Sequence, residues 1–262
     1  MTSLKDKPNY VGGHGLLAGK RVIVTAAAGA GIGFAAAKKA LEEGAKVMIS
    51  DIHEGRLQKA SEALAAECGE AVPWALCNVT QQPDVDKLFA LATEQFGGAD
   101  IVINNAGLGG AADLVDMTDD EWTNVIDVTL NGCFRINRAA FQHMRERGGG
   151  VIVNNASVLG WRAQKGQAHY AAAKAGVMAL TRCAGLEGAE YGIRVNAVAP
   201  SLAMHPFLHK VTSPELLQQL ESREAFGRAA EVWEIANVMI FLASDYSSYL
   251  TGETISASSQ RA

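Results

Sequence analysis

The chain has 262 residues, of which 19% are charged and 48% hydrophobic, as expected for a globular protein with room for one sizeable α/β domain. A net charge of −5 argues against a nucleic-acid partner, which needs a basic face. No apolar run approaches the ~18 residues of a membrane span, so we expect no membrane partner. The cysteines are scattered without a Cys-x-x-Cys pair, which predicts no bound metal and no disulfide framework and fits a reducing cytoplasm.

The first 19 residues are polar and dotted with glycine, and they lack the apolar core of a signal peptide. We therefore interpret residues 1–19 as an extension on the surface of the protein. No linker, internal repeat or low-complexity segment divides the rest, so residues 20–262 are predicted to form a single domain.

Short β-branched runs alternate along this domain with segments of helical composition. Strands are predicted at 20–25, 45–50, 71–77, 99–105, 149–155, 193–199 and 252–258, and helices at 34–44, 54–69, 82–97, 119–147, 167–191 and 229–244. Residues 201–227 are expected to be irregular or to form short helices. Strands separated by helices of this length form parallel sheets through right-handed crossovers. The pattern predicts a doubly wound Rossmann-type fold of about seven strands with helices on both faces.

A glycine-rich turn follows the first strand and opens the first helix, in the stretch VTAAAGAGIG at residues 24–33. A helix N-terminus carries free backbone N–H groups and a partial positive charge, and glycine lets the backbone approach a pyrophosphate closely. Gly29, Gly31 and Gly33 are therefore candidates for a dinucleotide cradle. Turns of this kind also serve packing alone.

Asp51 ends the second strand, about 20 residues after the glycines, where an acidic residue can accept hydrogen bonds from an adenosine ribose. A carboxylate there repels a 2′-phosphate, which favours NAD over NADP as the cofactor. His53 and Arg56 lie close by and could face a phosphate, or both could be solvated. Asp51 could instead serve only as a helix cap or turn residue.

Tyr170 and Lys174 form the sequence YAAAK, and at i and i+4 their side chains share one helix face. An ammonium beside a phenol stabilises the phenolate, which suits a general acid/base near neutral pH. Ser157 lies at the end of the fifth strand, on the sheet edge where ligands bind to such folds. Its hydroxyl can donate to a substrate oxygen while the tyrosine moves the proton.

From about Lys20 to Ser256 the chain resembles the short-chain dehydrogenase/reductases. The resemblance rests on the glycine turn, Asp51, NNAG at 104–107, Ser157, YAAAK and RVNAVAP at 194–200. It implies a nicotinamide oxidoreductase that interconverts an alcohol and a carbonyl group, with a small-molecule substrate.

The resemblance implies that Tyr170 is the acid/base, that Ser157 orients the substrate oxygen, and that Lys174 tunes the tyrosine and binds the nicotinamide ribose. NNAG would line the adenine-ribose side and stabilise the central sheet, although strand-end asparagines often only satisfy backbone groups. The implied cofactor-binding residues are Gly29, Gly31, Ile32, Gly33, Asp51, Asn78, Val79, Asn105, Ala106, Gly107, Tyr170, Lys174, Pro200 and Leu202.

Several positions depart from the family pattern. The first glycine of the turn is replaced by Ala26, and the turn has one extra residue. Where the family often has a relay asparagine the chain has Thr129, whose hydroxyl could hold a water. Asn131 lies about 200° further round the helix, where only a kink would bring it into the site. Asn78 replaces the usual aspartate of the adenine pocket, and its amide oxygen could accept from the adenine amino group.

The substrate is less determined by the residues. Residues 201–227 occupy the place of the family's substrate loop, and His205, Phe207, His209 and Lys210 could line it. Arg162, together with Trp161, Gln164 and Gln167, lies between the catalytic serine and tyrosine. A basic group at the pocket mouth could meet an anionic substrate such as an acyl-CoA.

The stretches TAAAG, PSLAMHPF and the terminal SSQ resemble an actinobacterial subgroup linked to steroid-ring degradation, which suggests a steroid-derived or acyl-CoA substrate. A 3-oxoacyl thioester reductase and a small-alcohol dehydrogenase remain alternatives, and a non-catalytic dinucleotide sensor is an alternative of another class. The family usually pairs its two long helices, here 119–147 and 167–191, across two-fold axes. A homo-oligomer is therefore expected, as a dimer or a tetramer.

Overall fold

A computed structural model describes residues 4–205 and 213–260. Seven strands form one sheet in the order β3-β2-β1-β4-β5-β6-β9, and every neighbouring pair is parallel. The doubly wound α/β fold is thus confirmed. The strands are β1 (Arg21–Thr25), β2 (Lys46–Asp51), β3 (Trp74–Leu76), β4 (Ile101–Asn104), β5 (Gly150–Asn155), β6 (Ile193–Pro200) and β9 (Thr254–Ala257).

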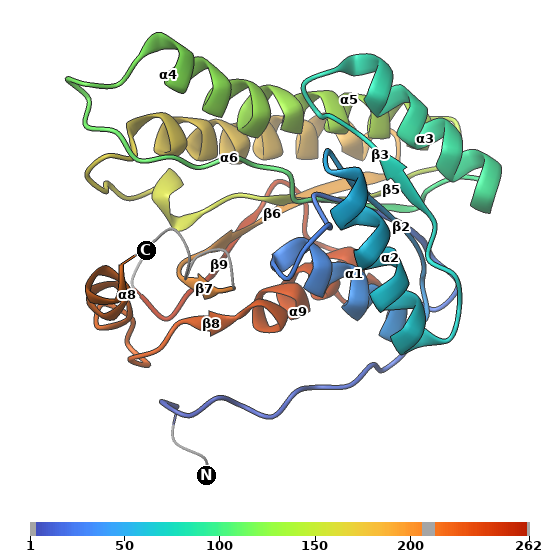
Figure 1. Ribbon diagram of the computed structural model, residues 1–262. Coiled ribbons are helices and arrows are strands. Elements are labelled where there is room, and N and C mark those ends of the chain that lie inside the picture. Colours follow the sequence, from blue (N-terminus) through green and yellow to red (C-terminus); the bar gives the residue numbers. More distant parts are fainter. Residues whose placement is uncertain (1–3, 206–212, 261–262) are drawn as a thin grey trace.

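Helices cover both faces of the sheet (Figure 1), with α1, α2 and α9 below it in that view and α3, α4, α5 and α6 above it. Their bounds are α1 (Ile32–Glu42), α2 (Glu54–Cys68), α3 (Gln82–Phe96), α4 (Asp119–Ile126), α5 (Gly132–Arg145), α6 (Ala168–Ala189), α8 (Pro214–Glu221) and α9 (Val232–Ala243). Within the part of the chain that the structure describes, no helix has the length and apolar character needed to cross a bilayer.

The central part of β1, β2, β4 and β5 is apolar because both faces of a parallel sheet are buried. In β1, Val22 and Val24 pack into the core shared with α1, α2 and α9, and Ile23 packs into the opposite core with α3 and α5. These side chains are at most 1% exposed. The sheet therefore lies between two buried cores.

The predicted long helix at 119–147 contains a π-helical segment at Asp127–Asn131 between α4 and α5. Single π-turns of this kind occur inside helices, frequently at functional sites. Directly after this segment Gly132 packs so closely on Val79, in the turn after β3, that a Cβ would lie 2.6 Å from its methyl group.

The structure also contains a small parallel sheet that the sequence analysis did not predict. It pairs β7 (Ala203–Met204) with β8 (Ala230–Glu231). β7 falls in the segment 201–227, which was expected to be irregular or to form short helices. β8 falls at the predicted start of the last helix, which begins only at Val232. This pairing brings residues 203–204 next to residues 230–231, and the Ser201 N–H just before β7 donates to the carbonyl of Ala257 at the end of β9.

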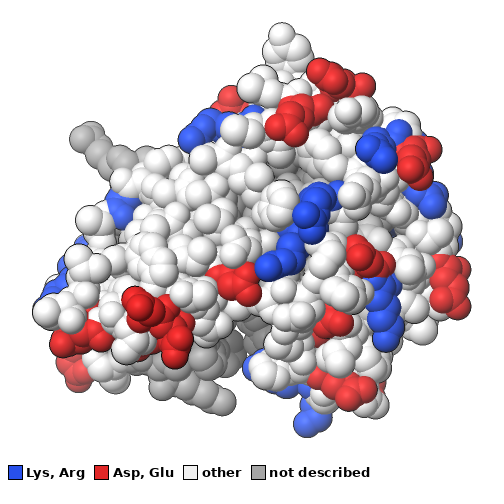
Figure 2. Space-filling model, turned by 90° about the horizontal axis from the view of Figure 1, so that it is seen from above, with Lys and Arg blue, Asp and Glu red and all other residues white. Residues whose placement is uncertain are grey.

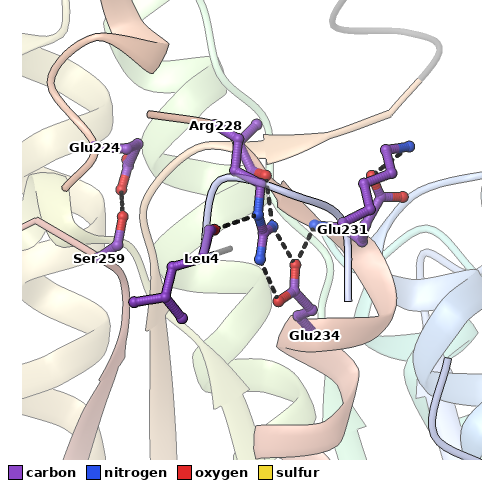
Figure 3. A network of polar contacts seen from close by, with 8 residues as sticks. Leu4, Glu224, Arg228, Glu231, Glu234 and Ser259 are labelled. Carbon is purple, nitrogen blue, oxygen red and sulfur yellow. Dashed lines mark hydrogen bonds and ion pairs between the residues drawn. The ribbon is translucent and has the colours of Figure 1, made fainter. Parts of the chain in front are cut away.

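The segment from Leu4 onward crosses the outside of α9 and α1, at the bottom of Figure 1. Arg228 donates to both oxygens of Glu234, at 2.7 and 2.9 Å, and to the carbonyl of Leu4 at 3.4 Å (Figure 3). The ring of Tyr10 packs edge-on against Trp233 at 5.3 Å. The extension is thus attached to the same region that carries β8.

Buried amides tie the two central strands to the upper helices. Asn154 is fully buried and accepts hydrogen bonds from Asn104 of β4 at 3.2 Å and from Asn137 of α5 at 2.9 Å. It also donates to the Thr181 hydroxyl of α6 at 3.0 Å. Every one of these groups would lose a partner if the amide were removed.

We therefore predict that Asn154→Leu lowers the free energy of unfolding by about 2–4 kcal/mol, because several buried polar groups are left unpaired. Urea denaturation at fixed protein concentration measures this loss. A loss below about 0.5 kcal/mol, the size typical of a surface substitution, would contradict the structural role given to the amide network.

Candidate active site

The loop between β1 and α1 keeps a left-handed residue at its start although glycine is absent there. Ala26 has φ = 51°, and no other described non-glycine residue has a positive φ. The hydroxyl of Thr25, just before it, accepts from the backbone N–H groups of Asn105 at 2.9 Å and Ala106 at 3.1 Å. The turn is therefore preserved with alanine in the strained position.

The glycines nearest the helix serve two different purposes. A Cβ on Gly33 would lie 2.4 Å from the Ala26 carbonyl oxygen and 2.5 Å from the Asn105 amide, so this close approach requires glycine. Gly31 is the N-cap of α1, supplies no capping side chain, and has no heavy atom within 4 Å of a Cβ position. The start of α1 thus has free space beside Gly31 and no capping side chain, as a pyrophosphate site requires.

A cavity of about 390 Å³ lies at the ends of β2 and β3, and Asp51 is among its lining residues. The Asp51 carboxylate accepts from the backbone N–H groups of Ala28 at 3.2 Å and His53 at 3.0 Å. Burial raises the pKa of Asp51 above its ordinary value, and the Ala28 N–H and the Arg56 guanidinium oppose that shift. Arg56 lies 4.0 Å away and is largely exposed.

Asn78 and Val79 line the same cavity, together with Ala106 and Gly107. The side-chain oxygen of Asn78 accepts from the backbone N–H of Thr80 at 3.0 Å and from its hydroxyl at 2.9 Å. The Asn78 oxygen is therefore already hydrogen-bonded within its own turn. To accept from an adenine amino group, as expected, it would have to give up one of the bonds from Thr80. The Asn78 NH₂ group has no hydrogen-bond acceptor among the described residues.

A second cavity, of about 240 Å³, lies at the ends of β5 and β6 and brings Ser157 and Tyr170 together. Ile32, Pro200 and Leu202 line it too, so both ends of the expected cofactor site are open cavities on one sheet edge. Ser157 is 8% exposed, and its oxygen accepts from the Leu159 N–H at 3.2 Å. The hydroxyl hydrogen is left for a substrate oxygen.

Lys174 is buried, and its ammonium lies 5.5 Å from the centre of the Tyr170 ring. It donates to the main-chain carbonyl of Asn155 at 2.5 Å. Gly107 leaves room for it, since a Cβ there would lie only 3.3 Å from the ammonium. The lysine is thus held at the end of β5, beside the tyrosine, as the i and i+4 spacing predicts.

Thr129 faces the site and Asn131 does not. Thr129 is 1% exposed, and its hydroxyl donates to the Leu108 carbonyl at 3.0 Å and accepts from the Leu108 N–H at 2.9 Å. Asn131 is exposed and donates to Asp127. The Thr129 hydroxyl therefore uses its only hydrogen to hold the loop after β4, so it positions that loop in this geometry.

The sequence analysis missed Asn155, which lines the cavity beside Ser157 and donates to Asn105 at 2.8 Å. The repeated asparagine at the end of β5 was the available signal, since strand alternation sends one of two successive side chains to each face. His205 lines the same cavity, and Arg162 donates to Gln260. The candidates Phe207, His209 and Lys210 lie outside the described residues.

The chain is similar over nearly its whole length to several known proteins. A family model described as enoyl-(acyl carrier protein) reductase matches residues 26–259. A Mycobacterium tuberculosis protein named (5R,7aS)-5-hydroxy-7a-methyl-1-oxo-2,3,5,6,7,7a-hexahydro-1H-indene-carboxyl-CoA reductase is 58% identical, over 98% of this chain and 99% of its own. A 3-oxoacyl-(acyl-carrier-protein) reductase of Thermotoga maritima is 38% identical, over 91% of this chain and 96% of its own.

A crystal structure described as a short chain dehydrogenase from Mycobacterium smegmatis is 53% identical to the chain and superposes with a TM-score of 0.89. The match covers 99% of this chain and all of that one.

We predict that Ala26→Gly leaves the free energy of unfolding unchanged or raises it by up to about 1.5 kcal/mol. Glycine removes a left-handed strain of about 1–2 kcal/mol but adds about 0.5–1 kcal/mol of unfolded-state entropy. Ala27→Gly is the matched control. Ala27 has a negative φ and is buried, so its loss should destabilise the protein. Equal destabilisation by the two changes would contradict strain at Ala26.

Proposed function

The chain belongs to the short-chain dehydrogenase/reductase family, and we propose that it works with NAD on a ring alcohol or ketone carried by a CoA thioester. It is an oxidoreductase that interconverts an alcohol and a ketone and uses a nicotinamide dinucleotide. The observation that carries the proposed site is the meeting of Ser157 and Tyr170 at one cavity, with the ammonium of the buried Lys174 5.5 Å from the centre of the tyrosine ring. A non-catalytic sensor would not need that set.

The nicotinamide supplies or takes the hydride when it is bound. In the ketone-reducing direction, the Ser157 hydroxyl donates to the substrate oxygen and fixes its position. Tyr170 gives its phenolic proton to that oxygen as negative charge develops, and the Lys174 ammonium stabilises the phenolate left behind. In the alcohol-oxidising direction the same groups act in reverse.

We assign the rest of the cofactor to the residues between the two cavities. Gly29, Gly31, Ile32 and Gly33 would hold the pyrophosphate at the start of α1. Asn78, Val79, Asn105, Ala106 and Gly107 would line the adenosine side, and Pro200 and Leu202 the nicotinamide side. The open N-terminus of α1 supports this assignment. Thr129 would act by positioning the loop at Leu108.

Asp51 favours NAD over NADP in this proposal. Its carboxylate lines the cavity and is anchored by two backbone N–H groups, so it cannot move far from an incoming 2′-phosphate. Arg56 is the opposing influence, because its exposed guanidinium could swing toward such a phosphate.

The substrate proposal rests on the relative with 58% identity, whose name describes a reductase of a fused five- and six-membered ring bearing a carboxyl-CoA group. A fused ring pair with an angular methyl group is what the breakdown of a steroid nucleus leaves. We therefore propose a steroid-derived acyl-CoA, with residues 201–227 as the substrate loop of a catalytic domain at 20–262 and residues 1–19 as its extension. The β7–β8 pairing supports a loop that closes beside the site.

We also propose that the protein is a cytoplasmic homo-oligomer, a dimer or a tetramer, which pairs through α5 and α6. Figure 2 looks onto the helix layer at the top of Figure 1 and shows a broad area with few charged side chains. Phe134 of α5 is 45% exposed and Leu186 of α6 is 78% exposed. Large apolar side chains left open on neighbouring helices are typical of a contact surface.

The function is tested by following absorbance at 340 nm with NAD and NADP in parallel. The panel contains hydroxylated bicyclic carboxyl-CoA thioesters, 3-hydroxyacyl-CoA thioesters, hydroxysteroids and short secondary alcohols. Turnover with NAD that is highest for the bicyclic thioesters supports the proposal. Highest turnover on 3-hydroxyacyl-CoA thioesters would favour a 3-oxoacyl thioester reductase instead. Highest turnover on short secondary alcohols would favour a small-alcohol dehydrogenase.

Tyr170→Phe is expected to lower turnover by a factor of about 10²–10⁴, because the proton donor is lost while the ring remains. The dissociation constant of NADH, measured by fluorescence titration, should change little. Turnover near that of the unchanged protein would overturn the acid/base assignment.

Asp51→Ala is expected to lower the ratio of kcat/KM for NAD to that for NADP by tenfold or more. The ribose loses its acceptor, and the 2′-phosphate no longer meets a carboxylate. Arg56→Ala is the control with the opposite sign, since it removes the cation that could accept the phosphate. A ratio unaffected by Asp51→Ala would mean that this carboxylate does not reach the ribose.

A further inference from the structure

One buried oxygen beside the catalytic residues has no hydrogen-bond donor. The side-chain oxygen Oδ1 of Asn155 is shielded from solvent and unpartnered. The rest of the residue is fully engaged, since its main-chain carbonyl accepts from Lys174 at 2.5 Å and its Nδ2 donates to Asn105 at 2.8 Å. A buried amide acceptor without a donor is costly, so a partner for Oδ1 is expected.

Turning the amide over cannot satisfy this oxygen. Asn105 donates its own Nδ2 to the Thr25 carbonyl at 3.3 Å and the Ala26 carbonyl at 3.1 Å, which fixes its Oδ1 toward Asn155. Asn155 must present its NH₂ group to that oxygen, because two facing oxygens would repel. The Asn155 Oδ1 is therefore directed away from Asn105 by the neighbouring hydrogen bonds.

A hydroxyl of a ligand in the adjoining cavity is a donor of the kind that Oδ1 lacks. Asn155 lines this cavity together with Ser157, Tyr170 and Ile32. The ammonium of Lys174 is held on the same residue, and in the proposed function it binds the nicotinamide ribose. The cofactor group near Lys174 that can donate a hydrogen bond is a ribose hydroxyl.

We propose that Asn155 is a cofactor-positioning residue, whose side-chain oxygen accepts a hydrogen bond from a hydroxyl of the nicotinamide ribose. This inference rests on the proposed use of a nicotinamide dinucleotide. Asn155 then joins the two halves of the site, because one face of its amide holds Asn105 and the glycine loop and the other holds the reactive end of the cofactor. It sets the height of the nicotinamide above Ser157 and Tyr170.

The test compares Asn155→Leu, which has the same branching at Cγ but no acceptor, with the unchanged protein in binding titrations. NADH and ADP are the probes, because ADP occupies the adenosine and pyrophosphate sites but has no nicotinamide ribose. We expect the dissociation constant of NADH to rise about 3- to 10-fold more than that of ADP, because both probes lose the effect of the bond to Asn105 and only NADH also loses the hydrogen bond to its ribose.

Two results would overturn the inference. Unchanged affinity for both probes would mean that Oδ1 is satisfied by water or not at all. An equal loss for NADH and ADP would mean that Asn155 acts only through Asn105 and the glycine loop. Failure of the unchanged protein to bind NADH would instead overturn the proposed function itself. Asn155→Val serves as the second variant if the leucine change prevents folding.

Thr254→Val is the matched control. The Thr254 hydroxyl is also a buried oxygen without a partner, but it lies at the start of β9 opposite Ala197, away from the carboxyl edge. Its removal should leave both affinities unchanged. A second probe is NADH that lacks one hydroxyl of the nicotinamide ribose. It should bind the unchanged protein more weakly than NADH does, and this difference should be smaller for Asn155→Leu.

Discussion

The hydrogen bonds of Asn105 fix the cofactor loop relative to the catalytic residues. Its amide NH₂ donates to the carbonyls of Thr25 and Ala26, and its oxygen accepts from Asn155. One side chain thus joins the end of β1, the end of β4 and the end of β5. Because Gly33 packs directly against this amide, the start of α1 is held at a fixed height over the sheet.

Two successive asparagines of β5 extend this hydrogen-bond network to both faces of the sheet. Asn154 points to the upper layer and is bonded to α5 and α6, whereas Asn155 points to the glycine loop. The main-chain carbonyl of Asn155 holds Lys174, and Ser157 follows two residues later. Lys174 and the glycine loop, the latter through Asn105, are therefore both tied by hydrogen bonds to the end of β5.

The sequence predicted what depends on periodicity and on short spacing. The seven strands of the main sheet follow from apolar runs, and Tyr170 meets Lys174 because four residues make about one helical turn. The π-helical segment at Asp127–Asn131 and the β7–β8 pairing were not predicted. Both arise from contacts between segments far apart in the chain, such as Gly132 on Val79. The isolated oxygen of Asn155 is likewise visible only in three dimensions.

The central claim is that one cofactor spans the carboxyl edge, from the cavity at Asp51 to the cavity at Ser157 and Tyr170. A crystal structure of the protein with NAD bound tests it most directly. The account predicts the adenosine ribose on Asp51, the pyrophosphate at the first turn of α1, and the nicotinamide ribose within hydrogen-bond distance of both Lys174 and the Asn155 side-chain oxygen. Adenosine bound away from Asp51, or a nicotinamide ribose that reaches neither Lys174 nor Asn155, would contradict it.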